Sequence, residues 1–515
     1  MNDSKPLYDH QQEAVDFLAS RDYSGALIHD PGCGKTRVVL ESIRLIPQDC
    51  LVLVVCPISI IEAAWAVDIK EWTPELTYHN YHKGKKFDWS KRINIINYES
   101  LRVARNAEAV KLQALRTPMM CVTDESSKFK APGSQITKVL LDLAPLFRYR
   151  LILSGTPTPN SELEWWSQIN FVEPGRLYAN FNKFKNSFFH LARNGQVQNM
   201  QGVHLTRKEL QKRFQTGWKY EISAQHKKYL LDLIAPVCSV AKKADCLDLP
   251  EQIDQVRDIE MNPEQKRIYK DLKTQLVAEI NGEFVVARNV LTKLMKLREV
   301  TSGFVFDEAG GVQDFGSKKF AELETLLDDI DGQVIIWGNY QYEMERIAEI
   351  VGKKRTTGLL YSKTKDRDQT IKDFIEGKID VLVAHPASAA HGLTFVNCSV
   401  QIFFSLSYSA EQYTQARART HRSGQKNVCT YIHLICKDTI DVDILKIVQR
   451  KISEQDAVIN IIGGKPTFTE APPIIHSAYI PKTTTPNGIP YIQKDACLCG
   501  HGESCHVCNP KKENK

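Results

Sequence analysis

The most specific chemical signature in this sequence is the glycine-rich turn IHDPGCGKTRVVL, residues 28–40. It follows a short apolar run and precedes a helical pattern, so it lies between a predicted strand and a predicted helix. Backbone N–H groups at the N-terminus of such a helix can hold phosphate oxygens. In this pattern Lys35 reaches the β- and γ-phosphates, and Thr36 coordinates Mg²⁺. We therefore predict a nucleotide site, with a plain tight turn as the alternative, formed by Pro31, Gly32, Cys33, Gly34, Lys35 and Thr36.

Two adjacent carboxylates are the next candidates for chemistry. Asp124 and Glu125 end the run MMCVTDE, directly after an apolar stretch that predicts a buried strand. Asp124 is placed to orient Mg²⁺ through water, and Glu125 to activate the attacking water. Alone, an acidic pair at a strand end is usually just solvated, so this interpretation depends on the phosphate loop.

Small polar residues end another apolar run, YRLILSGT. Here Ser154, Gly155 and Thr156 can sense the γ-phosphate and relay its loss. Without the other motifs, an ordinary Gly-Thr-Pro turn would be the preferred interpretation.

The segment EQYTQARARTHRSGQ, residues 411–425, supplies positive charge. If it is helical, Gln415, Arg419 and Arg422 fall within about 60° of one another, and Arg417 points to the opposite side. A positioned arginine can neutralise the charge that develops in phosphoryl transfer. We therefore predict that Arg419 and Arg422 act on the γ-phosphate across a cleft between two lobes. The alternative is an ordinary basic helix face.

Near the C-terminus, four thiols follow the spacing C-x-C-x₅-C-x₂-C, which suits a tetrahedral zinc site. They are Cys497, Cys499, Cys505 and Cys508. His501 or His506 could replace one of the cysteines, and the sequence leaves that choice open. A redox pair or a disulfide is the weaker alternative in a cytosolic protein. Metal would fold this short tail, which we expect to bind a substrate or a protein partner.

The composition is that of a globular protein with several domains. The chain has 515 residues, of which 43% are hydrophobic and 25% charged, and its net charge of +6 permits a polyanionic partner without requiring one. We expect no signal peptide and no membrane span, because the start is polar and the longest apolar run, CLVLVVCPISII, is short and contains Pro57. Nine of the 13 cysteines are scattered singly, as is typical of reduced cytosolic proteins.

The elements that must position these residues are short, continuously apolar runs that alternate with helical stretches. GALIHD, CLVLVVCP, INIINYES, MMCVTDE and YRLILSGT occupy the first half, and GQVIIWGN, IDVLVAHP, VQIFFSL and CTYIHLI the second. Continuous hydrophobicity predicts strands buried on both faces, hence parallel α/β sheets. Between Arg176 and Leu249 the chain is basic and amphipathic, without strand signals. The sequence therefore predicts two α/β lobes with helical insertions.

Taken in order, these segments resemble superfamily-two helicase-type motors, and within them the Swi/Snf-like DNA translocases. The resemblance runs from about Leu7 to Ile461. It is carried by CPISIIEAAWAVDIKEW, NYESL, SGTPTPNSELEWW and the pattern Q-A-x-x-R-x-x-R-x-G-Q from Gln415 to Gln425. Short protrusions make the chain most similar to the compact members found in bacteriophages and bacterial mobile elements.

The resemblance implies roles for further residues. LYDHQQEAV looks like the family's adenine-reading motif, with Gln11 as the reader. Ser126 and Ser127, in DESS, stand where other members couple the site to motion through Ala-His. Thr394 stands where an asparagine is frequent, which leaves the DNA contact of that loop less certain.

The resemblance also implies an α/β fold with two RecA-like lobes and a domain organisation along the chain. We expect RecA-like lobe 1 at 1–176, its helical protrusion at 177–250, a linker and helical protrusion of lobe 2 at 251–311, RecA-like lobe 2 at 312–462, a flexible linker at 463–494 and a zinc knuckle at 495–510.

The implied activity is ATP hydrolysis with Mg²⁺, coupled to movement on double-stranded or branched DNA, with a structural Zn²⁺ in the tail. The expected setting of this motor is phage replication or recombination. Two alternatives stay within the motor class, namely a strand-separating helicase and a branch-migration enzyme, the latter plausible in phage recombination. A third is an ATP-gated nucleic-acid clamp that uses hydrolysis only to release its partner.

Two segments mix basic and aromatic residues in a way that suits phosphate contact and base stacking, YHNYHKGKKFDWSKR and FNKFKNSFFH. Nothing in the sequence reads base edges, so we expect little sequence specificity. We expect a monomer without a membrane partner, located in the cytoplasm (that of a bacterial host if a phage encodes it).

Overall fold

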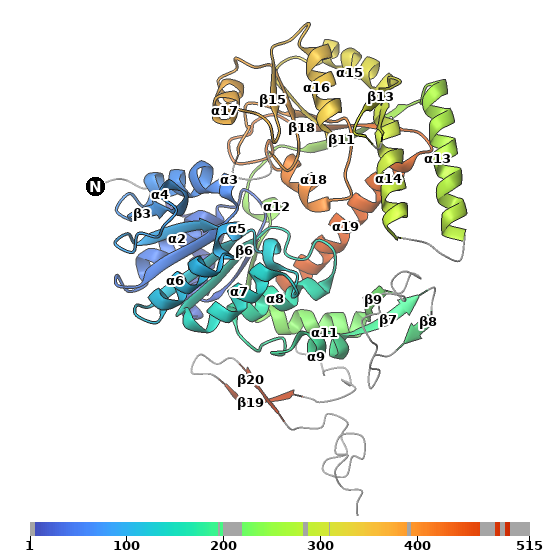
Figure 1. The fold of residues 1–515 in the computed structure, drawn as a ribbon. Coiled ribbons are helices and arrows are strands. Elements are labelled where there is room, and N and C mark those ends of the chain that lie inside the picture. The colour runs from blue at the N-terminus through green and yellow to red at the C-terminus, as the bar shows by residue number, and fades with distance from the viewer. Residues whose placement is uncertain are drawn as a thin grey trace, which may run out of the picture. The chain divides into compact units, whose positions relative to one another are not determined.

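The computed structural model describes residues 6–193, 196–198, 219–281, 287–307, 309–388, 393–463, 479–484 and 490–494. The chain divides into two compact units, shown in Figure 1. Unit 1 comprises Met1–Cys246 and Gln455–Lys515, and unit 2 comprises Leu247–Glu454.

Unit 1 is built on a parallel sheet of seven strands in the order β10-β1-β6-β5-β2-β4-β3. The strands are β1 (Gly25–His29), β2 (Leu51–Cys56), β3 (Tyr78–Asn80), β4 (Ile93–Asn97), β5 (Met119–Asp124), β6 (Tyr149–Ser154) and β10 (Cys238–Ala241). The helices include α1 (Asp9–Ser20), α2 (Lys35–Leu45), α4 (Ala66–Trp72), α5 (Tyr98–Leu101), α6 (Ala104–Ala114), α7 (Gln135–Leu143), α8 (Trp165–Val172), α9 (Phe181–Phe188), α11 (Ala224–Ile234) and α12 (Lys243–Cys246).

Successive side chains of one strand enter two different cores. Val52 and Val54 of β2 pack in one apolar cluster, and Leu53 and Val55 pack in the other. Both faces of the sheet are therefore buried, which explains why these strands read as continuous apolar runs.

Unit 2 has a parallel sheet of six strands in the order β11-β18-β17-β14-β16-β15. The strands are β11 (Gln252–Ile259), β14 (Val334–Trp337), β15 (Thr357–Leu360), β16 (Val381–Ala384), β17 (Val400–Phe403) and β18 (Cys429–Cys436). The helices are α13 (Pro263–Asn281), α14 (Ala287–Ser302), α15 (Lys318–Asp329), α16 (Gln341–Val351), α17 (Arg367–Ile375), α18 (Ala410–Arg417) and α19 (Ile440–Gly463), whose last turns belong to unit 1. The prediction of two parallel-sheet α/β lobes is confirmed.

The segment between Arg176 and Leu249 differs from its helical prediction, because it also contains strands. Strands β7 (Phe189–Arg193), β8 (Gln196–Gln198) and β9 (Lys219–Ile222) form an antiparallel sheet, and β10 joins the main sheet of unit 1. These strands are short and lack long apolar runs. A turn signal was nevertheless present in the sequence, since Asn-Gly at 194–195 is typical of tight hairpin turns.

Two other boundaries also differ from the sequence expectation. The stretch expected to begin a linker at 251 instead forms β11, an edge strand with seven of its eight residues exposed, so it lacked the apolar signal. The expected linker at 463–494 includes an antiparallel pair, β19 (Tyr479–Thr484) and β20 (Pro490–Lys494). The predicted zinc knuckle at 495–510 lies outside the described residues.

Candidate functional site

The phosphate loop, residues 31–36, connects β1 to α2. Gly32 and Gly34 have φ angles of 99° and 75°, values that favour glycine, and α2 begins at Lys35. The Lys35 Nζ donates a 2.8 Å hydrogen bond to the backbone oxygen of His29. Within the described residues, the ammonium donates to the backbone oxygens of His29 and Asp30 and to no carboxylate, so its charge can serve a phosphate.

Gln11, the residue expected to read adenine, is buried against this loop. Its Nε2 donates to the backbone oxygen of Cys33 at 3.4 Å, and its Oε1 accepts from the N–H of Tyr8 at 3.1 Å. A Cβ placed on Gly34 would collide with Gln11 Nε2. Gln11 thus contacts the phosphate loop directly, while its contact with a base remains a prediction.

Asp124 and Glu125 stand at the carboxyl end of β5, on the edge of the sheet where β1 leads into the phosphate loop. The buried Asp124 carboxylate accepts from Trp65 Nε1 at 3.0 Å and from the backbone N–H of Glu125 at 3.0 Å. Burial raises the pKa of Asp124, and the charge of Lys35 and the N–H of Trp65 oppose that rise. Glu125 has φ 56° and ψ 57°, a left-handed conformation that is costly for a residue with a side chain and is characteristic of functional sites.

Sequence reasoning missed two residues that hold Asp124. Trp65 ends a π-helical turn, Ile61–Trp65, and Tyr98 donates from its hydroxyl to the backbone oxygen of Asp124 at 2.7 Å. Both lie in segments that carried the family resemblance, CPISIIEAAW and NYESL, but the sequence did not show which side chains face the acid. Short π-helical turns are frequent at functional sites.

The residues after β6 pack directly on the phosphate loop. A Cβ placed on Gly155 would lie 2.8 Å from Pro31 Cδ and 3.2 Å from the backbone oxygen of His29, so the two segments are in close contact. The backbone N–H of Thr156 donates to Ser154 Oγ at 3.1 Å. The Thr156 Oγ1 is buried without a hydrogen-bond partner among the described residues. Such an orphaned hydroxyl beside the phosphate loop is available to a ligand.

The two serines of DESS are both buried, and Ser126 contacts helix α8. Ser126 is buried, and its hydroxyl donates to Gln168 Oε1 in α8 at 2.6 Å. The Gln168 amide donates in turn to the backbone oxygen of Pro157, just beyond Ser154–Thr156. Ser127 is also buried. Ser126 therefore connects the end of β5 to the segment after β6, which is the contact that a coupling role requires.

These residues fit a magnesium-bound nucleoside triphosphate. Thr36 and Asp124 offer the oxygen ligands that Mg²⁺ prefers, and Lys35 offers a cation for the phosphates. Bound Mg²⁺ would neutralise phosphate charge. Glu125 follows Asp124 at the same strand end and can accept a proton from water there.

The arginine segment belongs to unit 2, and the helix predicted through it ends at Arg417. The argument for a shared helical face of Gln415, Arg419 and Arg422 therefore fails. Arg417 binds Asp254 of β11 with contacts of 2.8 and 2.9 Å and lies over the ring of Tyr431, which gives it a structural role.

Arg419 and Arg422 both contact the segment that begins at Leu393. Arg419 is 2% exposed, and its guanidinium donates to the backbone oxygens of Gln415 and Leu393 at 3.0 Å each. Arg422 is partly exposed and donates to Thr394 Oγ1 at 2.9 Å. Of the two, Arg422 is the better candidate to reach a phosphate. The trans-lobe role of both arginines stays a prediction.

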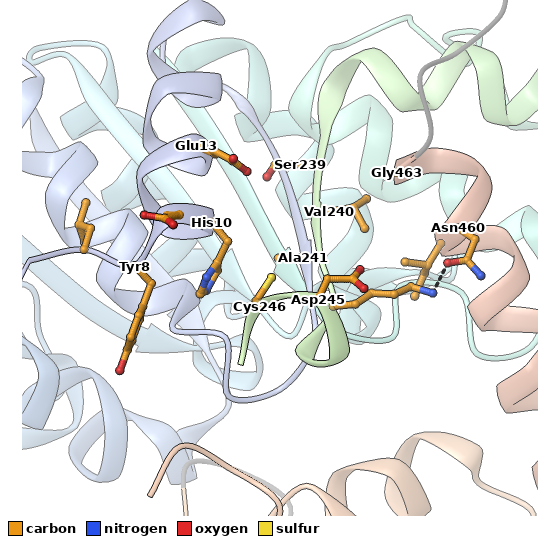
Figure 2. A pocket seen from close by; sticks show the side chains of 14 residues that line it. Tyr8, His10, Glu13, Ser239, Val240, Ala241, Asp245, Cys246, Asn460 and Gly463 are labelled. Carbon is orange, nitrogen blue, oxygen red and sulfur yellow. Dashed lines mark hydrogen bonds between the residues drawn. The ribbon is translucent and has the colours of Figure 1, made fainter. Parts of the chain in front are cut away.

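A pocket of about 690 Å³ lies within unit 1 (Figure 2). Its lining comes from the start of α1, the β10–α12 segment and the last turns of α19. His10 connects the pocket to the loop, since its Nε2 is 2.9 Å from the backbone oxygen of Cys33. The sequence did not point to this pocket, because its three parts lie far apart along the chain.

The aromatic residues expected to stack on bases have other roles. Phe184, Phe188 and Phe189, from FNKFKNSFFH, are buried in the core of unit 1. Phe87 and Trp89 stack on one another with centroids 4.6 Å apart. Base stacking by these aromatics is therefore not supported, although the neighbouring Lys85, Lys86 and Lys183 are exposed.

The described part of the chain contains no cluster of His, Cys, Asp or Glu that could hold a metal ion of its own. The four tail cysteines lie outside that part. None of its helices is long and apolar enough to cross a membrane.

Comparison with known proteins gives two family matches. The SNF2-related domain matches residues 10–303, more than half of the chain, and the helicase conserved C-terminal domain matches residues 318–424.

Among similar proteins, p41 of Acyrthosiphon pisum secondary endosymbiont phage 1 is 25% identical, over 67% of this chain and 72% of its own length. An uncharacterized ATP-dependent helicase of Mycoplasma pneumoniae is 24% identical, over 90% of this chain but only 43% of its own length. Protein CHROMATIN REMODELING 5 of Arabidopsis thaliana is 23% identical over 89% of this chain and 27% of its own length. The chain thus spans less than half the length of these two larger relatives.

A solved structure, the SWI2/SNF2 ATPase core of Sulfolobus solfataricus in complex with dsDNA, is 21% identical. It covers 89% of this chain and 94% of that chain, with a TM-score of 0.40.

Proposed function

The chain belongs to the SNF2-related family of helicase-type ATP hydrolases, and from this premise we propose that it couples ATP hydrolysis to movement along double-stranded or branched DNA. Membership in the family confirms the resemblance that the sequence suggested. The proposal goes further, because it names the motion, the nucleic acid and the residues that do the work.

One observation carries the proposal, namely that the catalytic candidates are divided between two compact units. Lys35, Asp124 and Glu125 belong to unit 1, and Arg419 and Arg422 belong to unit 2. If both sets act on one ATP, hydrolysis depends on the arrangement of the units and can change it. A motor requires this coupling, because each ATP turnover then changes how the two units bind the nucleic acid along which they move.

DNA is the proposed track on the basis of the family and of exposed basic residues. Lys85, Lys86 and Lys183 are exposed on unit 1 and can bind phosphate without reading sequence. The related phage protein supports a further proposal, a role in phage replication or recombination in the cytoplasm of a bacterial host.

The β7–β8 hairpin favours a second candidate function, strand separation. A separating helicase needs an element that divides the strands, and in this hairpin the last described pair is Arg193 with Gln196. Arg193 is exposed, so a basic side chain lies at the hairpin end. Deleting β8, Gln196–Gln198, should abolish unwinding but spare duplex-stimulated hydrolysis if the hairpin acts as a wedge.

The experiment that tests the proposal is the steady-state ATPase rate with no nucleic acid, single-stranded DNA, blunt duplex, a four-way junction or RNA. We expect duplex to stimulate turnover at least tenfold, with many ATP molecules hydrolysed per binding event. Stronger stimulation by the junction would indicate branch migration. Stimulation by single strands alone would favour the helicase, and a single turnover per binding event would favour the clamp. No stimulation by any nucleic acid would contradict the proposal.

A further inference from the structure

One wall of the pocket near the phosphate loop consists of α19 residues, which have no role in the hydrolysis described above. Asn460 and Gly463, from the last turns of α19, line it opposite the start of α1 (Figure 2). Helix α19 begins in unit 2, and its residues from Gln455 onward belong to unit 1. The part of the helix at the pocket is distant in sequence from Lys35, Asp124 and Glu125, the unit 1 residues that we place at the nucleotide.

Apolar packing holds this end of α19 in place. Val458, Ile459 and Ile462 are 4%, 4% and 3% exposed and belong to the same core cluster as Val237. The contact is close, since a Cβ added to Gly463 would lie 3.1 Å from Cγ1 of Val240. Burial of three aliphatic side chains fixes the helix register, so Asn460 is presented to the pocket.

Polar contacts connect the pocket lining to the phosphate loop on two sides. Asn460 Oδ1 accepts a hydrogen bond from Lys242 Nζ, and the N–H of the next residue, Lys243, donates to Asp30 Oδ2 at 3.0 Å. On the α1 side, His10 contacts Cys33 as described above. The pocket thus adjoins the residues that begin and form the phosphate loop.

The lining chemistry suits a neutral ring rather than another phosphate. The rings of Tyr8 and His10 stack 5.9 Å apart with an interplanar angle of 12°, and Tyr8 is 54% exposed. Three carboxylates, Asp9, Glu13 and Asp245, line the same space and can accept hydrogen bonds from amino groups. The one lysine of the lining, Lys242, donates to Asn460, so negative charge prevails and disfavours an anion. An aromatic surface beside hydrogen-bond acceptors is complementary to an amino-substituted base.

We infer that Asn460 and Gly463 of α19 are part of the nucleotide site and contact the nucleoside of the nucleotide whose phosphates the loop binds. The inference rests on the proposed function for the identity of that nucleotide. Under this inference, affinity for the nucleoside depends on α19, the helix that begins in unit 2, whereas affinity for the phosphates does not.

The test is calorimetric titration of the full chain with ADP and, separately, with inorganic tripolyphosphate. Asn460→Trp places an indole in the pocket and should weaken ADP binding at least tenfold, while tripolyphosphate affinity changes less than twofold. Ile461→Trp is the matched control, because Ile461 is 46% exposed and does not line the pocket. It should leave both affinities unchanged. Asn460→Ala, a milder change, should weaken ADP binding about threefold.

An Asn460→Trp protein that binds ADP like the parent chain would overturn the inference. So would a folded variant that loses both probes equally, since α19 would then act on the phosphate loop and not on the nucleoside. If Asn460→Trp fails to fold, unchanged ADP affinity in Asn460→Ala decides against the inference. A parent chain that binds neither probe would instead remove the proposed function, and the inference with it.

Discussion

Replacing Arg422 with alanine is expected to lower DNA-stimulated ATP turnover by about 10³-fold or more, the range in which arginines that stabilise phosphoryl transfer act. Arg422 is partly exposed, whereas Arg419 is buried against backbone oxygens. Loss of Arg422 should therefore remove a charge without opening the core. The measurement is the steady-state ATPase rate with saturating duplex DNA.

The matched control is Arg450→Ala, which removes an exposed arginine paired with Glu454 on α19. It should change turnover less than twofold. Arg419→Ala should lower turnover too, but with a lower unfolding temperature, because it leaves buried carbonyl groups without their donor. Turnover within tenfold of the parent rate in folded Arg422→Ala would exclude this residue from the catalytic step.

Replacing Glu125 with glutamine is expected to lower turnover about 10²- to 10⁴-fold, the usual contribution of a positioned general base. The amide keeps the size of the carboxylate and removes its basicity. ATP affinity should be kept or increased, because a negative charge near the phosphates is lost. The measurements are the ATPase rate and a calorimetric titration of the Glu125→Gln protein with ATP, which this variant hydrolyses slowly.

Asp124→Asn gives the contrast for this experiment. If Asp124 orients Mg²⁺, the asparagine should weaken Mg²⁺-dependent nucleotide binding as well as turnover. A Glu125→Gln protein that keeps more than a tenth of parent turnover would assign activation of water to another group.

The sequence was sufficient for the parts of the site that rest on local pattern. A glycine-rich turn between a strand and a helix, and an acidic pair at a strand end, are set by neighbouring residues. The phosphate loop and the Asp124–Glu125 pair indeed lie at the ends of β1 and β5 in one parallel sheet. Continuous apolar runs likewise predicted both sheets, because those strands are buried on both faces.

Features that depend on contacts distant in sequence could not be predicted in this way. The spacing of Gln415, Arg419 and Arg422 fitted a helix, but the helix ends at Arg417 and the arginines bond to backbone at Leu393 and to Thr394. Similarly, β11 pairs with β18, 177 residues later in the chain (Gln252 with Cys429), which no local apolar pattern encodes.

Contacts distant in sequence also explain why the prediction for FNKFKNSFFH was wrong and why the pocket was not predicted. Basic and aromatic residues are mixed in FNKFKNSFFH, which resembles a nucleic-acid surface, but Phe184 and Phe188 form the buried face of α9 and Phe189 is buried in β7. The pocket joins α1, α12 and α19, which come together only in the folded chain.

The most direct test of the central claim, movement along duplex DNA driven by ATP, is displacement of a short third strand from a triplex placed at the end of a long duplex. The account predicts that the parent chain displaces the third strand with ATP, more slowly as the duplex lead-in lengthens, and that Glu125→Gln does not displace it. Displacement no faster than with Glu125→Gln, in a chain whose ATPase is stimulated by the same duplex, would contradict translocation and identify a clamp.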